Sequence, residues 1–115
     1  MVLRERLADA HRRPGLYGLT TFGEVTAFVT GMDAATEWNF LKGFRDWLHH
    51  KSGLGASLTW QVLVVQIAYP NKDNNFWHRA MHEESVEAVT TLFNELDLFL
   101  SHRESDPNGD LPDLN

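Results

Sequence analysis

The chain has 115 residues, of which 43% are apolar and 23% charged, and its net charge is −6 at neutral pH. These values are typical of a globular domain and exclude collagen-like, low-complexity and disordered chains. The chain has no cysteine, which excludes disulfides, cysteine-ligated zinc, iron–sulfur clusters and thiol catalysis. No apolar run approaches the roughly 20 residues of a membrane helix, so we expect a soluble cytoplasmic protein.

Residues 2–12 have the spacing of a short amphipathic helix. Its apolar residues fall on one face, at Leu3, Leu7 and Ala10. We expect this helix to end before Pro14, because the residue that precedes a proline avoids the α conformation.

A second helix is predicted to begin at Thr21. Thr21 and Glu24 have the spacing of a capping box, in which each side chain accepts a hydrogen bond from the other residue's backbone amide. The apolar residues that follow recur at steps of three and four: Val25, Phe28, Val29 and Met32. These steps predict a helix of about three turns.

Residues 34–51 are expected to form a third helix with a strong apolar stripe. The stripe consists of Trp38, Phe40, Leu41, Phe44, Trp47 and Leu48, so we expect these side chains in the core. Basic side chains occupy the last turn, where the helix dipole stabilises positive charge. Gly53 follows as the candidate C-cap.

The fourth element, which ends at Tyr69, is compatible with two structures. Trp60, Leu63, Val64 and Ile67 have helical spacing, whereas residues 62–69 are rich in the β-branched side chains typical of a strand. A single strand would have no partner elsewhere in the chain, so we predict a helix and keep a strand at 62–69 as the alternative.

Two more helical segments are predicted after a polar loop at residues 71–75. One covers one or two turns from Phe76, and the other covers residues 83–102. The apolar positions of the second are Val86, Val89, Leu92, Phe93, Leu96, Phe99 and Leu100. The prediction is therefore an all-α, compact single-domain bundle of about five helices over residues 1–104, followed by an acidic C-terminal tail at 105–115 that contains proline and glycine.

The charge is unevenly distributed along the chain. Residues 1–80 carry nine bases and seven acids, a balance of +2, whereas residues 81–115 carry one base and nine acids, a balance of −8. An acidic segment repels phosphate backbones, so we expect no binding to nucleic acid. It attracts a basic protein partner and accelerates encounter with it, although an acidic surface that only keeps the protein soluble is the alternative.

His78 and His82 are four residues apart, a spacing at which two helical side chains can share a metal ion. With the adjacent Glu83 they allow a zinc or manganese site and a small metal-dependent hydrolase-like enzyme. The competing interpretation is a pair of surface histidines, because no third ligand follows at a fixed spacing. No serine lies in a nucleophile elbow and no glycine-rich phosphate loop is present, so we expect no cofactor and no catalytic residue.

An aromatic pair close to acidic residues is typical of a protein-binding surface. Such a pair follows the polar loop, although a place in the core is the alternative for both rings. The predicted partner-binding residues are Asp73, Phe76, Trp77, Glu83, Glu84 and Glu87.

Five segments follow one another along the chain: RRPGLYG, TFGEVTAFVTGMD, FLKGFRDWL, LTWQVLVVQIAYP and AVTTLFNELDLFL. Their pattern resembles small actinobacterial proteins, some of which lie beside polymorphic toxins and are taken to be immunity proteins. The resemblance implies a bacterial cytosolic protein without catalysis, and it assigns no site residue. The resulting hypothesis is a non-catalytic acidic binding protein, an immunity- or antitoxin-type inhibitor of a basic, nuclease-like toxin. The alternatives are the metal-dependent enzyme and a structural homodimer subunit.

Overall fold

The computed structural model describes residues 2–54, 58–80 and 85–105. These residues form six α-helices and one 3-10 helix, and they contain no strand. The elements are α1 (Val2–Arg12), η1 (Pro14–Tyr17), α2 (Phe22–Ala35), α3 (Phe44–Ser52), α4 (Trp60–Ala68), α5 (Asn74–Ala80) and α6 (Val86–Ser105). The all-α prediction is confirmed, and the alternative of a strand at 62–69 is wrong. The tail from residue 106 onward lies outside the described residues.

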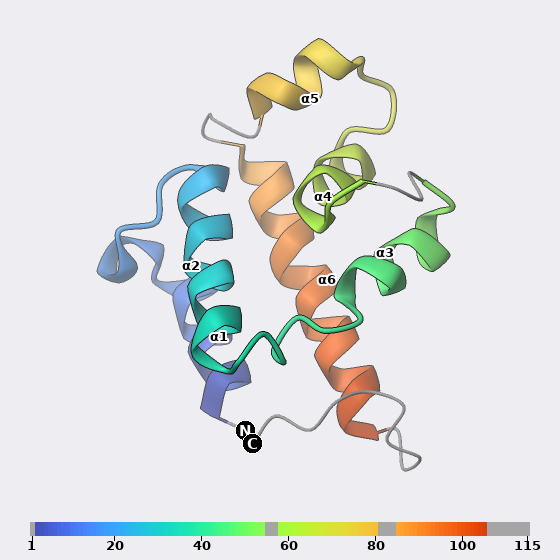
Figure 1. Cartoon of the computed structure of the whole chain (residues 1–115). Coiled ribbons are helices and arrows are strands. Elements are labelled where there is room, and N and C mark those ends of the chain that lie inside the picture. The colour runs from blue at the N-terminus through green and yellow to red at the C-terminus, as the bar shows by residue number, and fades with distance from the viewer. Residues whose placement is uncertain (1, 55–57, 81–84, 106–115) are drawn as a thin grey trace.

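The long helix α6 runs through the middle of the molecule, and α1, α2, α3 and α4 all pack against it. In Figure 1, α1 and α2 lie on one side of α6, α3 and α4 lie on the other, and α5 lies near the end at which α6 begins. The buried apolar side chains of α6 are Ala88, Leu92, Phe93, Leu96, Phe99 and Leu100. This broad apolar surface explains why neighbours cover α6 on several sides.

The predicted helix ends at Thr21 and Gly53 are both confirmed. The Thr21 hydroxyl accepts a hydrogen bond from the Glu24 amide at 3.1 Å, and the Glu24 carboxylate accepts one from the Thr21 amide at 2.9 Å. The backbone amides of Thr21 and Thr20 hold the pKa of Glu24 below its usual value. Gly53 has a φ of 73°, and its amide donates to the His49 carbonyl at 2.8 Å.

The prediction of one helix over residues 34–51 is wrong. Helix α2 ends at Ala35, and the chain turns over residues 36–43 before α3 begins. Within this turn Glu37 and Trp38 have φ values of 58° and 63°, in the left-handed region that side chains other than glycine rarely adopt. The break therefore carries backbone strain at two consecutive residues.

Burial of Phe40 and Leu41 accompanies this break. They expose 0% and 7% of their surface, as the apolar stripe predicts, but they reach the core from the turn rather than from a helix. The Asp33 carboxylate accepts a hydrogen bond from the Leu41 amide at 2.9 Å, and the Asp33 carbonyl accepts one from the Trp38 amide at 2.8 Å. These two bonds satisfy backbone groups that a continuous helix would have paired.

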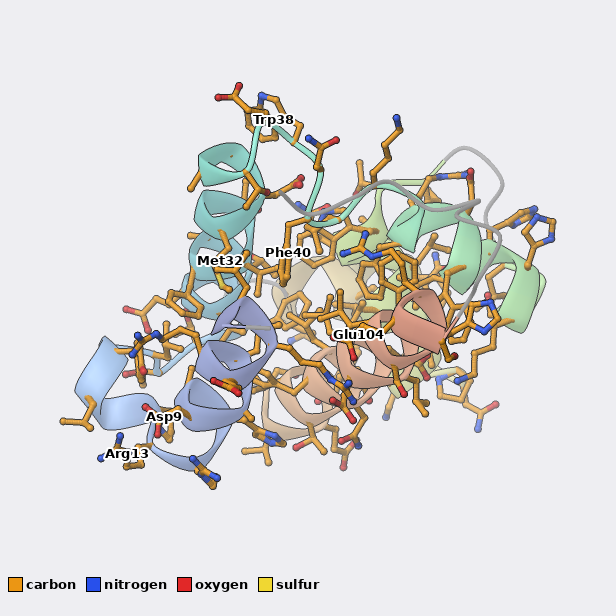
Figure 2. All side chains as sticks on the ribbon, turned by 90° about the horizontal axis from the view of Figure 1, so that it is seen from below. Asp9, Arg13, Met32, Trp38, Phe40 and Glu104 are labelled. Atoms are coloured by element: carbon orange, nitrogen blue, oxygen red, sulfur yellow. The ribbon has the colours of Figure 1, made fainter. Side chains whose placement is uncertain are left out.

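The expectation that Trp38 lies in the core is also wrong, since 61% of its surface is exposed. Figure 2 shows its side chain standing clear of the ribbon beyond the end of α2, whereas Phe40 points into the bundle. By contrast, Trp47 and Trp60 are partly buried against the core, as predicted.

A carboxylate cluster joins α1 to η1. The Asp9 carboxylate accepts two hydrogen bonds from the Arg13 guanidinium, at 2.9 and 2.8 Å, and one from the Tyr17 hydroxyl at 2.6 Å. Arg13, and after it Tyr17, hold the pKa of Asp9 far below its usual value. These hydrogen bonds hold η1 against the end of α1.

Replacement Asp9→Asn tests this cluster through its pH dependence. A carboxylate with a depressed pKa in the folded state stabilises the fold above its unfolded pKa of about 3.9, and this contribution is lost as the pH falls below that value. We expect the variant to be less stable than the parent at pH 7, and the difference in urea midpoint to shrink between about pH 4 and pH 2. A difference that stays constant over this range would contradict the assignment.

Replacement Glu37→Gly tests the strain in the 36–43 turn. Glycine adopts a positive φ without steric penalty, whereas other residues lose about 1–2 kcal/mol there. We expect Glu37→Gly and Trp38→Gly to raise the free energy of unfolding by up to about 1 kcal/mol, after the entropy that glycine adds to the unfolded chain. The control is Asn39→Gly, at a neighbouring position without positive φ, which should lower the stability. Urea denaturation in which all three variants lose stability equally would exclude the strain.

Candidate functional site

Asp73 of the predicted binding surface is the N-cap of α5. Its carboxylate accepts a hydrogen bond from the Phe76 amide at 2.9 Å, and its carbonyl accepts one from the Trp77 amide at 3.1 Å. The Asp73 side chain is exposed. Its charge made Asp73 a predicted partner-binding residue, and the structure shows that it also caps the first turn of α5.

The aromatic pair Phe76 and Trp77 holds α5 against the end of α4. Both side chains are partly buried against the core. The Trp77 indole nitrogen donates a hydrogen bond to the Tyr69 carbonyl at 2.8 Å, and the Phe76 ring meets the Tyr69 ring edge-on with centroids 4.9 Å apart. The Lys72 ammonium lies 5.1 Å from the centroid of the Phe76 ring. These contacts give the pair a packing role, and its role in binding stays a prediction.

Several of the predicted residues lie outside the described part of the chain. These are Glu83, Glu84 and His82, and the side chain of His78 is not described either. Among the described residues, no group of three or more histidine, aspartate or glutamate side chains is placed to hold a metal ion. The metal hypothesis and the acidic run therefore remain predictions.

The start of α6 is fixed by a partly buried hydroxyl pair and leaves the Val86 side chain exposed. The Ser85 and Tyr69 hydroxyl oxygens are 2.6 Å apart, which joins the beginning of α6 to the end of α4. The next residue, Val86, exposes 76% of its surface although the apolar stripe predicted it in the core. It occupies the first position of α6, and Glu87 beside it is also exposed. The structure therefore brings an apolar and an acidic side chain together at this helix end.

An apolar cavity of about 250 Å³ opens beside Val86. It lies between the first turns of α6, the first turns of α2 and the segment around η1. Its apolar walls are formed by Pro14, Leu19, Val25, Val86, Val89 and Phe93. A cavity of this size and lining accepts one or two apolar side chains.

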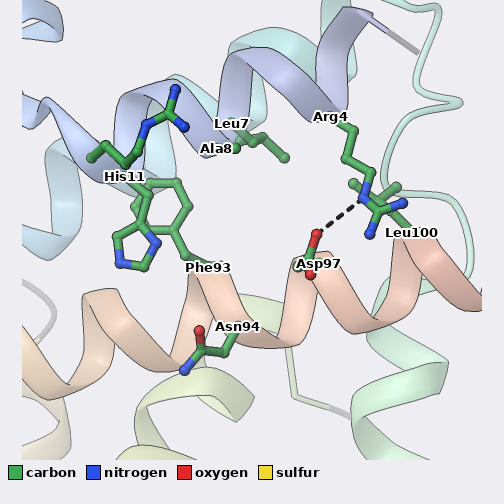
Figure 3. Close-up of a pocket in the computed structure, with 9 residues that line it drawn as sticks. Arg4, Leu7, Ala8, His11, Phe93, Asn94, Asp97 and Leu100 are labelled. Carbon is green, nitrogen blue, oxygen red and sulfur yellow. Dashed lines mark hydrogen bonds and ion pairs between the residues drawn. The ribbon is translucent and has the colours of Figure 1, made fainter.

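A second cavity, of about 280 Å³, follows the seam between α1 and α6 (Figure 3). Its walls include Leu7, Leu100 and the ion pair of Arg4 with Asp97, whose atoms are 3.0 Å apart. The rings of His11 and Phe93 line both cavities and stack with centroids 4.5 Å apart. The two cavities are therefore neighbours that share this ring pair as a wall.

Much of the acidic character of α6 is neutralised by distant bases. Arg4 meets both Asp97, at 3.0 Å, and Glu104, at 2.7 Å. The Lys51 ammonium meets the Glu95 carboxylate at 3.0 Å. One guanidinium offsets one of these two carboxylates, so along the described part of α6 one negative charge remains at Asp97 and Glu104 and another at Glu87, which forms no ion pair with a described residue.

Two charged residues of α6 are buried although the sequence pattern does not mark them as core residues. Glu95 is 8% exposed and binds Lys51, while the Trp47 indole nitrogen donates to it at 3.4 Å. Arg103 is also 8% exposed and donates to the carbonyls of Asn39 and Lys42, and burial lowers its pKa. Their only signal in the sequence is an eight-residue spacing that places both on one face of the helix.

Replacement Trp77→Phe separates the packing role of Trp77 from a role in binding. It keeps an aromatic ring but removes the donor to the Tyr69 carbonyl, so we expect a loss of about 1–2 kcal/mol in the free energy of unfolding. The control is Trp38→Phe, since the exposed indole of Trp38 makes no hydrogen bond among the described residues, and its effect should stay below about 0.5 kcal/mol. Equal melting of Trp77→Phe and the parent would show that the bond does not stabilise α5.

The helices in the described ranges are all too short or too polar for a membrane span. Comparison with protein-family models, curated proteins and solved structures finds no match to this chain.

Proposed function

We propose that this chain is a cytoplasmic, non-catalytic binding protein that docks a basic protein at the start of α6. The more specific proposal, which the resemblance of the sequence pattern favours, is an immunity- or antitoxin-type inhibitor of a nuclease-like toxin. The observation that carries the proposal is the exposure of Val86, 76% of whose surface faces solvent at the mouth of an apolar cavity. A large aliphatic side chain exposed beside an apolar hollow is typical of a contact surface.

The occupant that fits this surface is a protein segment with an apolar side chain flanked by lysine or arginine. The apolar side chain would enter the cavity between α2 and α6, against Val89 and Phe93. A basic group beside it would meet Glu87 and, on the expected acidic run, Glu83 and Glu84. The apolar contact supplies the slow dissociation typical of interface hot spots. The acidic residues supply the fast, salt-dependent encounter that charge complementarity gives.

The basic character of the partner follows from the charge that remains available at this end of α6. The acids further along the helix are paired within the chain, Asp97 and Glu104 with Arg4 and Glu95 with Lys51. A nuclease holds its phosphate substrate in a cationic cleft, so an acidic inhibitor surface is complementary to it. Arg4 offsets only one of the two carboxylates that it meets, so one negative charge also remains further along the helix. The exposed Val86 beside Glu87 is the feature that places the proposed contact at the α6 start.

Charge reversal Glu87→Lys tests the proposal against the matched control Glu5→Lys. Both residues are exposed, both lie in the first turn of a helix, and both changes alter the net charge equally. Each loses a similar helix-dipole contribution, on the order of 1 kcal/mol or less. The partner is identified by affinity capture from the native host, purified, and its association measured by surface plasmon resonance. We expect Glu87→Lys to raise Kd by roughly fivefold, mainly through slower association, and Glu5→Lys to leave it unchanged.

The apolar half of the surface is tested by Val86→Asp with Leu98→Asp as its control. Leu98 is an exposed apolar residue of the same helix, at 49% of its surface. Introducing a carboxylate at the cavity mouth should weaken binding by at least about tenfold, because the charge would be desolvated by the bound side chain. Equal effects of both variants, or a captured partner without net positive charge, would refute the proposal. Self-association of the purified chain in light scattering would instead favour the homodimer.

A further inference from the structure

We propose that Arg103 is a carboxylate-binding site at the end of α6, and that Asp110 of the same chain supplies the carboxylate. The Nη2 group of the Arg103 guanidinium donates to the Asp110 side chain, which ties the C-terminal tail to the last turns of α6. This inference goes beyond the proposed function, because Arg103 lies at the opposite end of α6 from Val86 and Glu87.

An N–H group without an acceptor is the first observation. Arg103 exposes 8% of its surface, so more than nine-tenths of the residue is buried. Its Nη2 atom is shielded from solvent and forms no hydrogen bond with any described residue. Buried polar groups are nearly always hydrogen-bonded, and a guanidinium stays charged inside a fold. The Nη2 group therefore requires an acceptor that the described ranges do not supply.

The partners that Arg103 does have are neutral, which is the second observation. The Nη1 group donates to the carbonyls of Asn39 and Lys42 at 3.3 and 3.4 Å, longer than the usual length of about 3.0 Å. The guanidinium carbon also lies 5.0 Å from the centroid of the Phe99 ring. A buried cation without a counter-ion is costly, and the planar guanidinium matches the two oxygens of a carboxylate. The missing acceptor is therefore assigned as a carboxylate.

Two carboxylates act on Arg103, but both are engaged elsewhere. Burial lowers the pKa of Arg103, and the charges of Glu104 and Asp33 partly oppose this shift. Glu104 forms its ion pair with Arg4 at 2.7 Å, and Asp33 accepts a hydrogen bond from the Leu41 amide at 2.9 Å. Within the described ranges neither carboxylate forms an ion pair with Arg103. The next carboxylates in the sequence are those of the C-terminal tail.

The order of residues after α6 brings Asp110 back to the helix. The tail lies outside the described residues, so its course is inferred from residue types alone. Residues 106–109 read DPNG, with aspartate, proline and glycine at the first, second and fourth positions that a type I turn prefers. A turn there reverses the chain directly after Ser105, and Asp110 is the first residue to run back. Side chains on a helix lean toward its N-terminus, so the Arg103 guanidinium and the returning chain lie at the same level of the helix.

The other aspartates of the tail are less suitable. Asp106 occupies the first position of the turn, where an aspartate side chain accepts hydrogen bonds from the amides of the turn itself. Asp113 lies three residues beyond Asp110, up to about 10 Å further along an extended chain. Asp110 is therefore the assigned counter-ion, and Asp113 serves as a matched control of the same charge.

A double-mutant cycle in urea tests the assignment. Asp110→Asn and Asp113→Asn are each made in the parent and in Arg103→Met, whose side chain has a similar length and no charge. In the parent we expect Asp110→Asn to lower the urea midpoint by roughly 0.5–1 M, and Asp113→Asn to leave it within about 0.2 M. In the Arg103→Met background, where the cation is gone, Asp110→Asn should also have no effect beyond about 0.2 M. Equal losses from Asp110→Asn in both backgrounds, or a coupling at Asp113 instead, would overturn the inference.

Nitrogen-15 NMR of the Arg103 side chain gives a second measurement, which holds even where Arg103→Met does not fold. An N–H group bonded to a carboxylate exchanges slowly with solvent. We expect the Arg103 side-chain N–H groups to exchange at least about tenfold faster in Asp110→Asn, and within about twofold of the parent rate in Asp113→Asn. Exchange that Asp110→Asn leaves unchanged would show that water, rather than the tail, satisfies Nη2.

Inorganic phosphate distinguishes the tail from a free anion. It is added to the parent at constant ionic strength, with sodium chloride as the matched salt. We expect the Arg103 side-chain signals of the parent to stay in place, because Asp110 already fills the site. Saturable movement of these signals with phosphate, as large in the parent as in Asp110→Asn, would assign the site to an external anion and overturn the inference.

Discussion

Two charged side chains buried on α6 determine where the chain between α2 and α4 can lie. Glu95 and Arg103 are eight residues apart with Phe99 midway, so all three lie on one face of the helix. The Lys51 ammonium meets the Glu95 carboxylate at 3.0 Å, and two carbonyls of the 36–43 turn accept hydrogen bonds from Arg103 at 3.3 and 3.4 Å. A buried charge left without such partners costs about 3–5 kcal/mol. The turn and the end of α3 are therefore tied to α6 at two separate points.

This constraint explains which parts of the fold the sequence predicts. The helices with capping signals and a regular stripe, such as the one that begins after Thr21, depend on local chemistry and were predictable. The break between α2 and α3 is contacted by Arg103, which lies 64 residues from Asn39 in the sequence, and no proline or glycine marks it before Gly43. The stripe identified Phe40 as a core residue correctly, because apolar burial follows composition even where the local structure does not.

The candidate site was predictable only in part, for a similar reason. Its place near the start of α6 follows from the acidic residues around Glu87. The direction of individual side chains depends on neighbours from other elements. The Trp77 indole points inward because its nitrogen donates a hydrogen bond to the Tyr69 carbonyl, whereas no described residue covers most of Val86. Net charge along the sequence also overstates the acidity of α6, since Arg4 near the N-terminus pairs with two of its carboxylates and offsets one of their two negative charges. The net charge of a sequence segment counts every charged side chain, whereas the charge that a surface presents depends on which of those side chains form ion pairs.

The hydroxyl contact between Tyr69 and Ser85 has a consequence for how this molecule could be modified. It joins the two ends of the segment that carries α5, since Tyr69 follows α4 and Ser85 precedes α6. The entropy of closing such a loop rises only by about 0.6 kcal/mol for each doubling of its length. The intervening segment can therefore lengthen, or accept an inserted domain, while α4 and α6 stay in register. Diversification of this architecture, by evolution or by protein engineering, would be tolerated best at this segment.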